Sequence, residues 1–426
     1  MSHGTHGPQR LAMSCALVVA PLLVLTACGE SGHPLAAVPY DASSDVVVGV
    51  GRPLGGDGGE KRPVDADRPL EVTAEDGGAR LTDVLAVDGD GRRVAGELAE
   101  DGSGWRSTTP LVAGAAYTVR VSTESADGRP GRRTVRFDTG DATGGKRLKV
   151  AFGPESGTYG VGQPVTAELS RAVSEPEQRR LVERGLRVRS QPRTEGAWHW
   201  VDDRKLHYRP KEYWPARATV TVRSALAGVR IRKNLHGAAD ASLTLRTGDR
   251  VEAVADAAAL EMRVERNGEV ARTMPITTGK AGFRTRNGTK VILGRDSFVR
   301  MRSTSIGIGR GSSEFYDLPV HWATRLTWSG EYVHGAPWST GSQGYANVSH
   351  GCTGMSTADA KWFFDNVRRG DLVTHVNTEG SRMPAFGNGF GDWNLDWEEW
   401  RAGSALLTDS RPDADPAAAA RLRPQL

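Results

Sequence analysis

The chain has 426 residues and a formal net charge of +4, so its length allows about two to four domains. Acidic and basic residues are interspersed, and no basic stretch indicates a nucleic-acid-binding protein. The 52 glycines, set against only 9 phenylalanines, favour many strands and turns over long helices. We therefore expect a mostly β protein that has no nucleic-acid partner.

The N-terminal segment has the pattern of a secretory signal. Arg10 precedes an apolar run of 17 residues, Leu11 to Ala27, which ends in Leu-Thr-Ala before Cys28. This ending resembles a bacterial lipobox, which implies cleavage before Cys28 and a lipid on its sulfur. An uncleaved anchor helix is the alternative, although a run of 17 residues is at the short limit for a membrane span. We expect a signal peptide over residues 1–27 and a tether over 28–44.

Two β-sandwiches are predicted to follow in tandem. Apolar and polar residues alternate at 117–121 and 134–137, and turn residues separate these short runs, which is typical of sandwich strands. The pattern then recurs, and each of the two units closes with Thr-Gly-Asp after a strand. We expect immunoglobulin-like domains over 45–140 and 146–248, with a short helix within 175–187.

A third, β-rich domain is predicted over 250–378. The pair Asn267-Gly268 lies between alternating runs and predicts a hairpin. One principal helix is expected, because Ser356 can cap it, Asp359 lies at the position of a capping box, and Gly370 can end it. A Trp-rich subdomain over 379–405 is expected to pack back on this domain. Residues 406–426 are expected to be a disordered tail.

One cysteine is left free by this processing. Of the three cysteines, Cys15 leaves with the signal and Cys28 takes the lipid, so Cys352 remains unpaired in a class of proteins where cysteines usually form disulfides. The segment 349–354 ends just before the predicted helix, so Cys352 would lie near its positive N-terminal end, which would lower the pKa of the thiol. Gly351 can expose a backbone N–H to a developing oxyanion. The alternative is a small, buried, unreactive side chain.

Two histidines are candidate bases for this thiol. His350 shares a face with Cys352 on an extended chain, but its ring is poorly placed to meet the thiol, whereas His334 on a neighbouring strand can meet it directly. Each could instead be a structural or surface imidazole. A zinc site is disfavoured because one Cys and two His lack a second Cys. We expect no metal and no cofactor.

These residues resemble the signature of the L,D-transpeptidase (YkuD-type) catalytic domain. That signature is a His, a gap of some fifteen residues, Ser/Thr-His-Gly-Cys, one residue and Asn, and this chain has His334-Gly335 followed by 349–352. The segments 332–339, 361–365 and 369–371 are similar to the actinomycete-type lipoprotein branch, which also has two immunoglobulin-like domains. The resemblance therefore covers nearly the whole chain.

The resemblance implies a role for each residue of the site. Cys352 attacks a peptidoglycan tetrapeptide stem after the L-centre of diaminopimelate, D-Ala leaves, and a thioester forms. An acceptor stem then attacks, which gives a 3→3 cross-link. His334 acts as base and acid, the carbonyl of Gly335 orients its ring, and N–H groups near Gly351 and Cys352 hold the oxyanion. His350 is a structural polar contact.

The resemblance also implies substrate contacts, inhibitors and a location. A mobile flap covers the site at about 295–320. Carbapenem-type β-lactams are the expected inhibitors, and the protein is expected to be lipid-anchored at the outer face of the cell membrane, facing the cell wall. Two positions depart from the family pattern, since Gly354 stands for the Asn and Ile306 for an aromatic of the flap. The residues expected at the substrate are Met301, Tyr316, Ser329, Gly330, Trp338, Ser349, His350 and Gly354.

Several alternatives stay open at this point. The same Cys and His could serve an L,D-carboxypeptidase or a transpeptidase that attaches a protein. A sortase or a papain-like amidase is disfavoured, because Thr-x-Thr-Cys is absent from the sequence and the candidate His precedes the Cys. A non-catalytic, cell-wall-binding lipoprotein is the remaining reading. The two sandwiches are expected to act as spacers.

Overall fold

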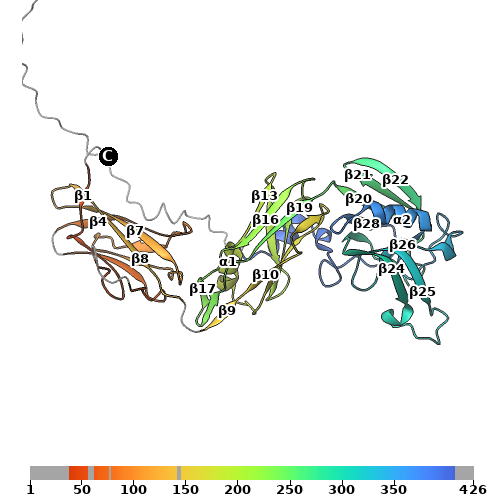
Figure 1. Ribbon diagram of the computed structural model, residues 1–426, viewed down its shortest axis with the longest axis horizontal. Helices are drawn as coiled ribbons and strands as arrows, with labels where there is room; N and C mark the ends of the chain where they lie inside the picture. The colour runs from red at the N-terminus through yellow and green to blue at the C-terminus, as the bar shows by residue number, and fades with distance from the viewer. Residues whose placement is uncertain (1–37, 56–61, 76–77, 142–144, 408–426) are drawn as a thin grey trace, which may run out of the picture.

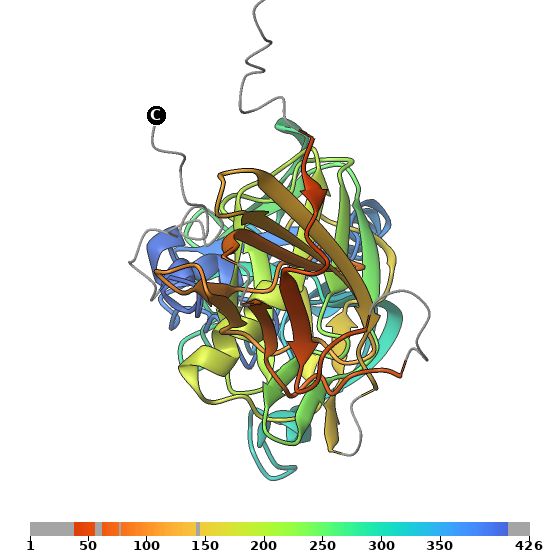
Figure 2. The ribbon, with the colours of Figure 1, turned by 90° about the vertical axis from the view of Figure 1, so that its left-hand side faces the viewer.

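The computed structural model describes residues 38–55, 62–75, 78–141 and 145–407. Three folded units lie in a row, with the first sandwich at one end and the domain that carries Cys352 at the other (Figure 1). Figure 2 looks along this row, with the first sandwich in front. The predicted signal peptide and Cys28 lie outside the described residues. Within them, no helix is long and apolar enough to span a membrane. The predicted mostly β class is confirmed.

The first sandwich consists of two four-stranded sheets, with strand orders β1-β8-β7-β4 and β2-β3-β6-β5. Alternation produces its core, because Tyr117, Val119 and Val121 of β7 all point inward and are at most 3% exposed. The strands are β1 (Tyr40–Asp41), β2 (Val46–Val50), β3 (Leu70–Ala74), β4 (Arg80–Asp88), β5 (Gly96–Leu98), β6 (Gly104–Ser107), β7 (Ala116–Glu124) and β8 (Pro130–Asp138).

The second sandwich pairs the sheets β10-β12-β15-β14 and β11-β19-β16-β13, and adds the small sheet β17-β18-β9. The short helix expected within 175–187 is present as α1 (Pro176–Gly185), which begins with a proline, as helix starts favour. The strands are β9 (Lys146–Leu148), β10 (Val150–Gly153), β11 (Gly157–Tyr159), β12 (Val165–Leu169), β13 (Leu186–Gln191), β14 (Gly196–Trp200), β15 (Lys205–Pro210), β16 (Thr219–Ser224), β17 (Arg230–Arg232), β18 (Leu235–Gly237) and β19 (Ser242–Thr247).

The third domain contains a five-stranded sheet, β22-β21-β20-β28-β23, and a four-stranded sheet, β24-β25-β26-β27. The predicted hairpin joins β21 to β22, and Asn267 and Gly268 both have positive φ, at 53° and 88°. The elements are β20 (Val251–Asp256), β21 (Glu261–Arg266), β22 (Glu269–Pro275), β23 (Gly288–Val291), β24 (Gly294–Arg302), η2 (Ser303–Ile306), β25 (Asp317–Arg325), β26 (Tyr332–Gly335), η3 (Pro337–Ser339), β27 (Thr353–Met355), α2 (Thr357–Asn366) and β28 (Leu372–Val376).

The principal helix α2 begins as predicted and ends earlier. The Ser356 side chain accepts a hydrogen bond from the Asp359 N–H. The predicted end at Gly370 is wrong, because Val367 is already extended, with φ −115° and ψ 165°. Gly370 instead turns the chain into β28 at φ 91° and lies against Gly160 of the second sandwich. The helix therefore ends at Asn366.

The Trp-rich C-terminal segment packs on two domains, although the sequence predicted packing on the third domain alone. It carries η4 (Asp392–Asn394) and α3 (Trp397–Ala402). The Asp392 carboxylate lies 2.7 Å from Nδ1 of His207, and the Arg209 guanidinium lies 4.7 Å from the Trp400 ring centre. On the other side, Asn394 accepts from the Thr289 N–H at 2.8 Å. The segment thus ties the second sandwich to the third domain.

Candidate active site

Two parallel strands bring His334 and Cys352 together. Strand β26 pairs with β27, and His334 lies in register with Gly354. Cys352 directly precedes β27, and Gly330 lies just before β26, so the two entry segments meet at one edge of the sheet. The thiol donates to the Gly330 carbonyl over a sulfur–oxygen distance of 3.5 Å. Residues far apart in sequence therefore form one compact site.

The tautomer of His334 follows from its one backbone partner. Its Nδ1 lies 2.8 Å from the Gly335 carbonyl oxygen, and a carbonyl can only accept, so Nδ1 carries the hydrogen and Nε2 keeps its lone pair. The side chain is buried, and this desolvation lowers the pKa of His334. The ring is therefore neutral and presents a basic nitrogen.

The thiol of Cys352 is also neutral at rest. Its residue is partly exposed, but close packing around the sulfur raises the pKa of Cys352 to about 12, against a partial lowering by the Tyr332 N–H. The prediction of a lowered pKa is wrong, because β27 separates Cys352 from α2 and the thiol does not lie at the helix end. Ionisation of this thiol requires a base.

The loop before Cys352 is held by its own hydroxyl groups. Gly351 has a φ of 117°, which favours glycine, and its N–H donates to Ser349 Oγ at 3.1 Å. The Ser349 hydroxyl in turn donates to the Cys352 carbonyl at 2.6 Å, and Thr285 Oγ1 donates to the Gly351 carbonyl at 2.9 Å. In this conformation the Gly351 N–H is engaged by Ser349, which leaves the Cys352 N–H as the other oxyanion group that the resemblance implies.

A cavity of about 270 Å³ opens beside the two residues. It is walled by Cys352 and His334 and by most of the expected substrate contacts, namely Met301, Tyr316, Trp338, Ser349, His350 and Gly354. Ser329 and Gly330 do not line it. They form the turn before β26, where Ser329 accepts from the Asn388 amide at 2.9 Å.

Further apolar and hydroxyl groups line this cavity that sequence reasoning missed. Leu318 and Val320 alternate along β25, and this period of two could have placed them on one face. Thr277 meets the site through bridges to Gly354 that no local pattern reveals. The lining residues not foreseen are Thr277, Leu318, Val320, Ala336, Ser339 and Val348.

The hairpin of β24 and β25, called the flap below, lies at the expected place. Near its tip, Glu314 Oε2 lies 2.6 Å from Nζ of Lys280 and 2.6 Å from Nε2 of His350. Lys280 is the main cause that lowers the pKa of Glu314. His350 therefore pairs with the flap, which agrees with its expected role as a polar contact. Glu314 and Lys280 were not foreseen.

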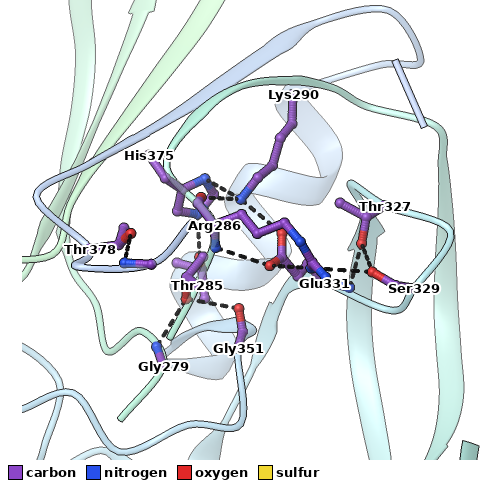
Figure 3. A network of polar contacts seen from close by, with 12 residues as sticks. Gly279, Thr285, Arg286, Lys290, Thr327, Ser329, Glu331, Gly351, His375 and Thr378 are labelled. Carbon is purple, nitrogen blue, oxygen red and sulfur yellow. Dashed lines mark hydrogen bonds and ion pairs between the residues drawn. The ribbon is translucent and has the colours of Figure 1, made fainter. Parts of the chain in front are cut away.

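A set of buried polar side chains lies behind the loop of Cys352. Lys290 is fully buried and reaches Glu331 and His375 (Figure 3). Sequence reasoning missed all three, although a lysine next to the apolar run Val-Ile-Leu is a signal of a buried charge. In the described parts of the chain, no cluster of three His, Cys, Asp or Glu side chains could hold a metal ion.

The fold and site define a class of protein: tandem sandwiches that carry a β-rich domain with a Cys and a His on neighbouring parallel strands under a hairpin flap. Two family matches agree with this architecture. A bacterial Ig domain matches residues 61–230, and the L,D-transpeptidase catalytic domain matches residues 250–374.

The known proteins of similar sequence described next are all named as L,D-transpeptidases. The chain is 35% identical over 342 residues to L,D-transpeptidase 2 of Mycobacterium tuberculosis (strain CDC 1551 / Oshkosh), which covers 80% of this chain and 82% of that protein. It is 40% identical over 228 residues to L,D-transpeptidase 1 of strain H37Rv, or 53% of this chain and 84% of the relative. A solved L,D-transpeptidase in complex with imipenem is 39% identical, covers 54% of this chain and 100% of its own, and has a TM-score of 0.47. The chain belongs to the L,D-transpeptidase family.

Proposed function

We propose that this protein forms 3→3 cross-links between diaminopimelate residues of peptidoglycan stem peptides, through a thioester on Cys352. The observation that carries the proposal is the lone pair on Nε2 of His334, on the strand that neighbours the thiol. A neutral thiol and a neutral imidazole that line the same cavity, with the imidazole lone pair on Nε2, are the starting state of a base-activated nucleophile.

The reaction follows from these two protonation states. His334 Nε2 takes the proton of the thiol as sulfur attacks the stem carbonyl after the L-centre of diaminopimelate. The carbon–nitrogen bond to D-Ala breaks, and the imidazolium returns the proton to the leaving amine. An acceptor amine then attacks the thioester, gives a proton to His334, and frees the thiol as the new amide forms. Each cycle exchanges one amide for another and needs no cofactor.

The size of the cavity favours a donor stem that enters as an extended chain. Its volume of about 270 Å³ lies just below the usual range of about 300–1,000 Å³ for pockets that enclose a whole small ligand. One segment of a stem fits there, while the rest of the polymer stays outside. The flap that lies over the cavity can exclude water from the thioester, which favours an amine acceptor over hydrolysis.

Export and a lipid on Cys28 are part of this proposal. The N-terminal pattern supports them, and so does the arrangement of the described domains, because the two sandwiches lie between the catalytic domain and residue 38, where the described part of the chain begins (Figure 1). The sandwiches would then act as spacers between membrane and polymer. A globomycin-sensitive shift in mass of the cell-associated protein, lost in Cys28→Ala, tests this part.

Carbapenem-type β-lactams are proposed as inhibitors. A strained β-lactam amide should acylate a base-activated thiol by the same attack that opens the stem peptide. Intact-mass measurement should show one adduct on the wild-type protein and none on Cys352→Ala. A persistent lack of adduct on folded wild-type protein would favour a non-catalytic wall-binding role.

The central test is mass spectrometry of a purified tetrapeptide stem incubated with the enzyme. A dimer joined between two diaminopimelate residues, with loss of D-Ala, supports the proposal. A trimmed stem without dimer identifies an L,D-carboxypeptidase instead. Cys352→Ala should give neither product while the fold persists, and dimer formation at the wild-type rate by that variant would refute the assignment of the nucleophile.

A further inference from the structure

A buried polar network bridges the two sheets of the catalytic domain. We call the side chains of Arg286, Lys290, Glu331, Thr353 and His375 the Lys290 network. Its members come from both sheets, since β23 and β28 belong to one, and β27 and the turn before β26 belong to the other. Figure 3 shows Lys290 reaching between His375 and Glu331, with Arg286 beside Glu331. The network lies between the two sheets, where apolar side chains usually form the core.

Lys290 is the centre of this network. Its side chain is 0% exposed, and its Nζ lies 2.8 Å from Glu331 Oε2, 2.8 Å from the Arg286 carbonyl oxygen and 3.2 Å from His375 Nδ1. An ammonium has three hydrogens and no lone pair, so Nζ donates to the Arg286 carbonyl and to His375, and it faces the Glu331 carboxylate as an ion pair. Glu331 is shared with Arg286, whose Nη1 lies 3.0 Å from Oε1. The nitrogen atom of Lys290 therefore has one defined position.

Lys290 also fixes the tautomer of His375. Because the ammonium can only donate, Nδ1 of His375 accepts, and the ring hydrogen lies on Nε2. Nε2 then donates to Thr353 Oγ1 at 2.8 Å. Burial, with Lys290 nearby, lowers the pKa of His375 well below its usual value, so the ring stays neutral. A continuous chain of polar contacts thus runs from Glu331 to Thr353.

The two ends of this chain lie on either side of the thiol. Thr353 directly follows Cys352. Glu331 directly follows Gly330, whose carbonyl oxygen lies 3.5 Å from the sulfur. A shift of Lys290 would move both the backbone that carries the thiol and the backbone that contacts it. The geometry of the sulfur relative to β26 therefore depends on the network.

We propose that Lys290 is a positioning residue for the nucleophile, which acts through Glu331 on one side and through His375 and Thr353 on the other to hold Cys352 in line with His334. The proposal rests on the function proposed above. Replacing a buried ion pair by well-packed apolar side chains is often neutral or stabilising. Core stability alone therefore gives no reason for a charged pair at this place, whereas a defined sulfur position does.

The first experiment compares Lys290→Met, Glu331→Gln and the double variant with the wild-type enzyme. For Lys290→Met we expect kcat to fall at least about tenfold, since a misplacement of 1 Å can cost about a hundredfold, with little change in KM for the donor. The double variant should also stay slow, because restoring the charge balance does not restore the His375–Thr353 contact.

The second readout is alkylation of Cys352 by iodoacetamide at a fixed, mildly alkaline pH, followed by mass spectrometry. The Lys290 charge lowers the pKa of Cys352 and the Glu331 charge raises it. Alkylation should therefore slow in Lys290→Met, speed up in Glu331→Gln, and return toward the wild-type rate in the double variant. A role in core packing alone would not give these opposite signs.

A gentler pair of variants covers the case in which Lys290→Met does not fold. Thr353→Val removes the hydroxyl that accepts from His375 and keeps the ammonium in place. Its matched control is Thr324→Val, because Thr324 is also a fully buried strand threonine and its hydroxyl has no partner among the described residues. Thr353→Val should lower kcat, and Thr324→Val should not.

Two outcomes would overturn the proposal. In the first, folded Lys290→Met and Thr353→Val retain the wild-type kcat. In the second, kcat falls while the alkylation rate of the thiol is unchanged, so Lys290 acts elsewhere than on Cys352. Alkylation needs no stem peptide, so a failure of the proposed cross-linking reaction would leave this test of the coupling between Lys290 and the thiol intact.

Discussion

Nδ1 of His334 lies 2.8 Å from the carbonyl oxygen of Gly335, the next residue on the same strand. The base is therefore oriented by the main chain and needs no third side chain. This arrangement makes the geometry of the imidazole depend on β26 being intact and paired with β27. It also means that the residue after His334 can change without loss of the hydrogen bond, provided that the backbone stays in place.

The first prediction separates the imidazole from its backbone partner. His334→Ala should lower kcat/KM nearly as far as Cys352→Ala, because the two groups act as a unit. Gly335→Ala should keep most of the activity. A Cβ there would meet the His321 carbonyl oxygen at 3.3 Å, a small crowding at ordinary backbone angles. Steady-state cross-linking rates of the three variants test this. A Gly335→Ala enzyme as slow as His334→Ala would contradict backbone orientation.

The second prediction concerns pH. Activity requires neutral His334, whose pKa is lowered by burial from 6.5. The acid limb of kcat/KM should therefore lie below about pH 6.5. The pKa of Cys352, raised to about 12, should add no limb near neutrality. A bell centred between a low thiol pKa and a high imidazole pKa would instead indicate a preformed ion pair.

Circular dichroism at each pH is the control for that profile. His334 and His375 are buried, and the pKa of each is lowered in the folded protein. The unfolded chain thus binds protons that the native state does not. The contribution of these two histidines to the free energy of unfolding is therefore complete above about pH 6.5 and falls as the pH drops below it. Loss of activity counts toward the acid limb only where the fold is retained.

The third prediction concerns the flap. Glu314→Gln removes the charge that Lys280 and His350 both contact at 2.6 Å. The closed flap should become less populated, and KM for the donor stem should rise roughly two- to fivefold, the size expected for a partly exposed ion pair. Added salt should raise KM of the wild-type enzyme toward that of the variant.

Asp317→Asn is the matched control for the flap. Asp317 begins β25 of the flap. Its carboxylate pairs with Arg300 at 2.7 Å, within the flap, rather than with Lys280 or His350. Its substitution should leave KM and its salt dependence unchanged. Equal effects of both substitutions would indicate a general charge effect and would contradict a specific role for the contacts of Glu314 with Lys280 and His350.

The fourth prediction concerns Gly354, where the resemblance implied an Asn. A Cβ at this position would lie 3.0 Å from Cβ of Ala336 and 3.1 Å from Cγ2 of Thr277. Gly354→Asn should therefore overpack the site, destabilise the fold by about 1–3 kcal/mol, and lower kcat. Gly354→Ala should show a smaller effect of the same sign. A more active, equally stable Gly354→Asn enzyme would refute this packing argument.

Local signals in the sequence were sufficient for local structure. Alternation predicted the sandwich strands, Asn267-Gly268 predicted a hairpin, and Ser356 predicted the start of α2. The unpaired Cys352 and the motif around it pointed to the site. These features depend on neighbours within a few residues along the chain, so they can be predicted from a single sequence.

Features that depend on burial were not predictable in this way. The pKa of Cys352 was predicted in the wrong direction, because the thiol is desolvated by distant segments and β27 lies between Cys352 and the start of α2. Glu314 meets His350, and Lys290 meets His375, across long stretches of chain. Such contacts are determined by tertiary packing, which local residue patterns do not predict.

The fifth prediction concerns Asp371, in the turn where the catalytic domain meets the second sandwich. Burial raises its pKa from 3.8 to about 7. Its Oδ1 is buried without a hydrogen-bond partner among the described residues, while Oδ2 accepts from the Arg368 N–H at 2.8 Å. The folded protein thus binds this proton more tightly than the unfolded chain. The resulting stability is complete below about pH 4 and is lost as the pH rises through 7.

Asp371→Asn removes this loss, because an amide keeps the acceptor for Arg368 and cannot ionise. Its free energy of unfolding should exceed that of the wild type by on the order of 1–4 kcal/mol above pH 7, and the difference should shrink toward pH 4. Urea unfolding across this range measures it. Asp365→Asn, at an exposed carboxylate of α2 paired with Lys361, should leave the pH dependence unchanged. If Asp371→Asn were less stable than the wild type at alkaline pH, the carboxylate would be a needed partner at this domain junction rather than a buried, unfavourable charge.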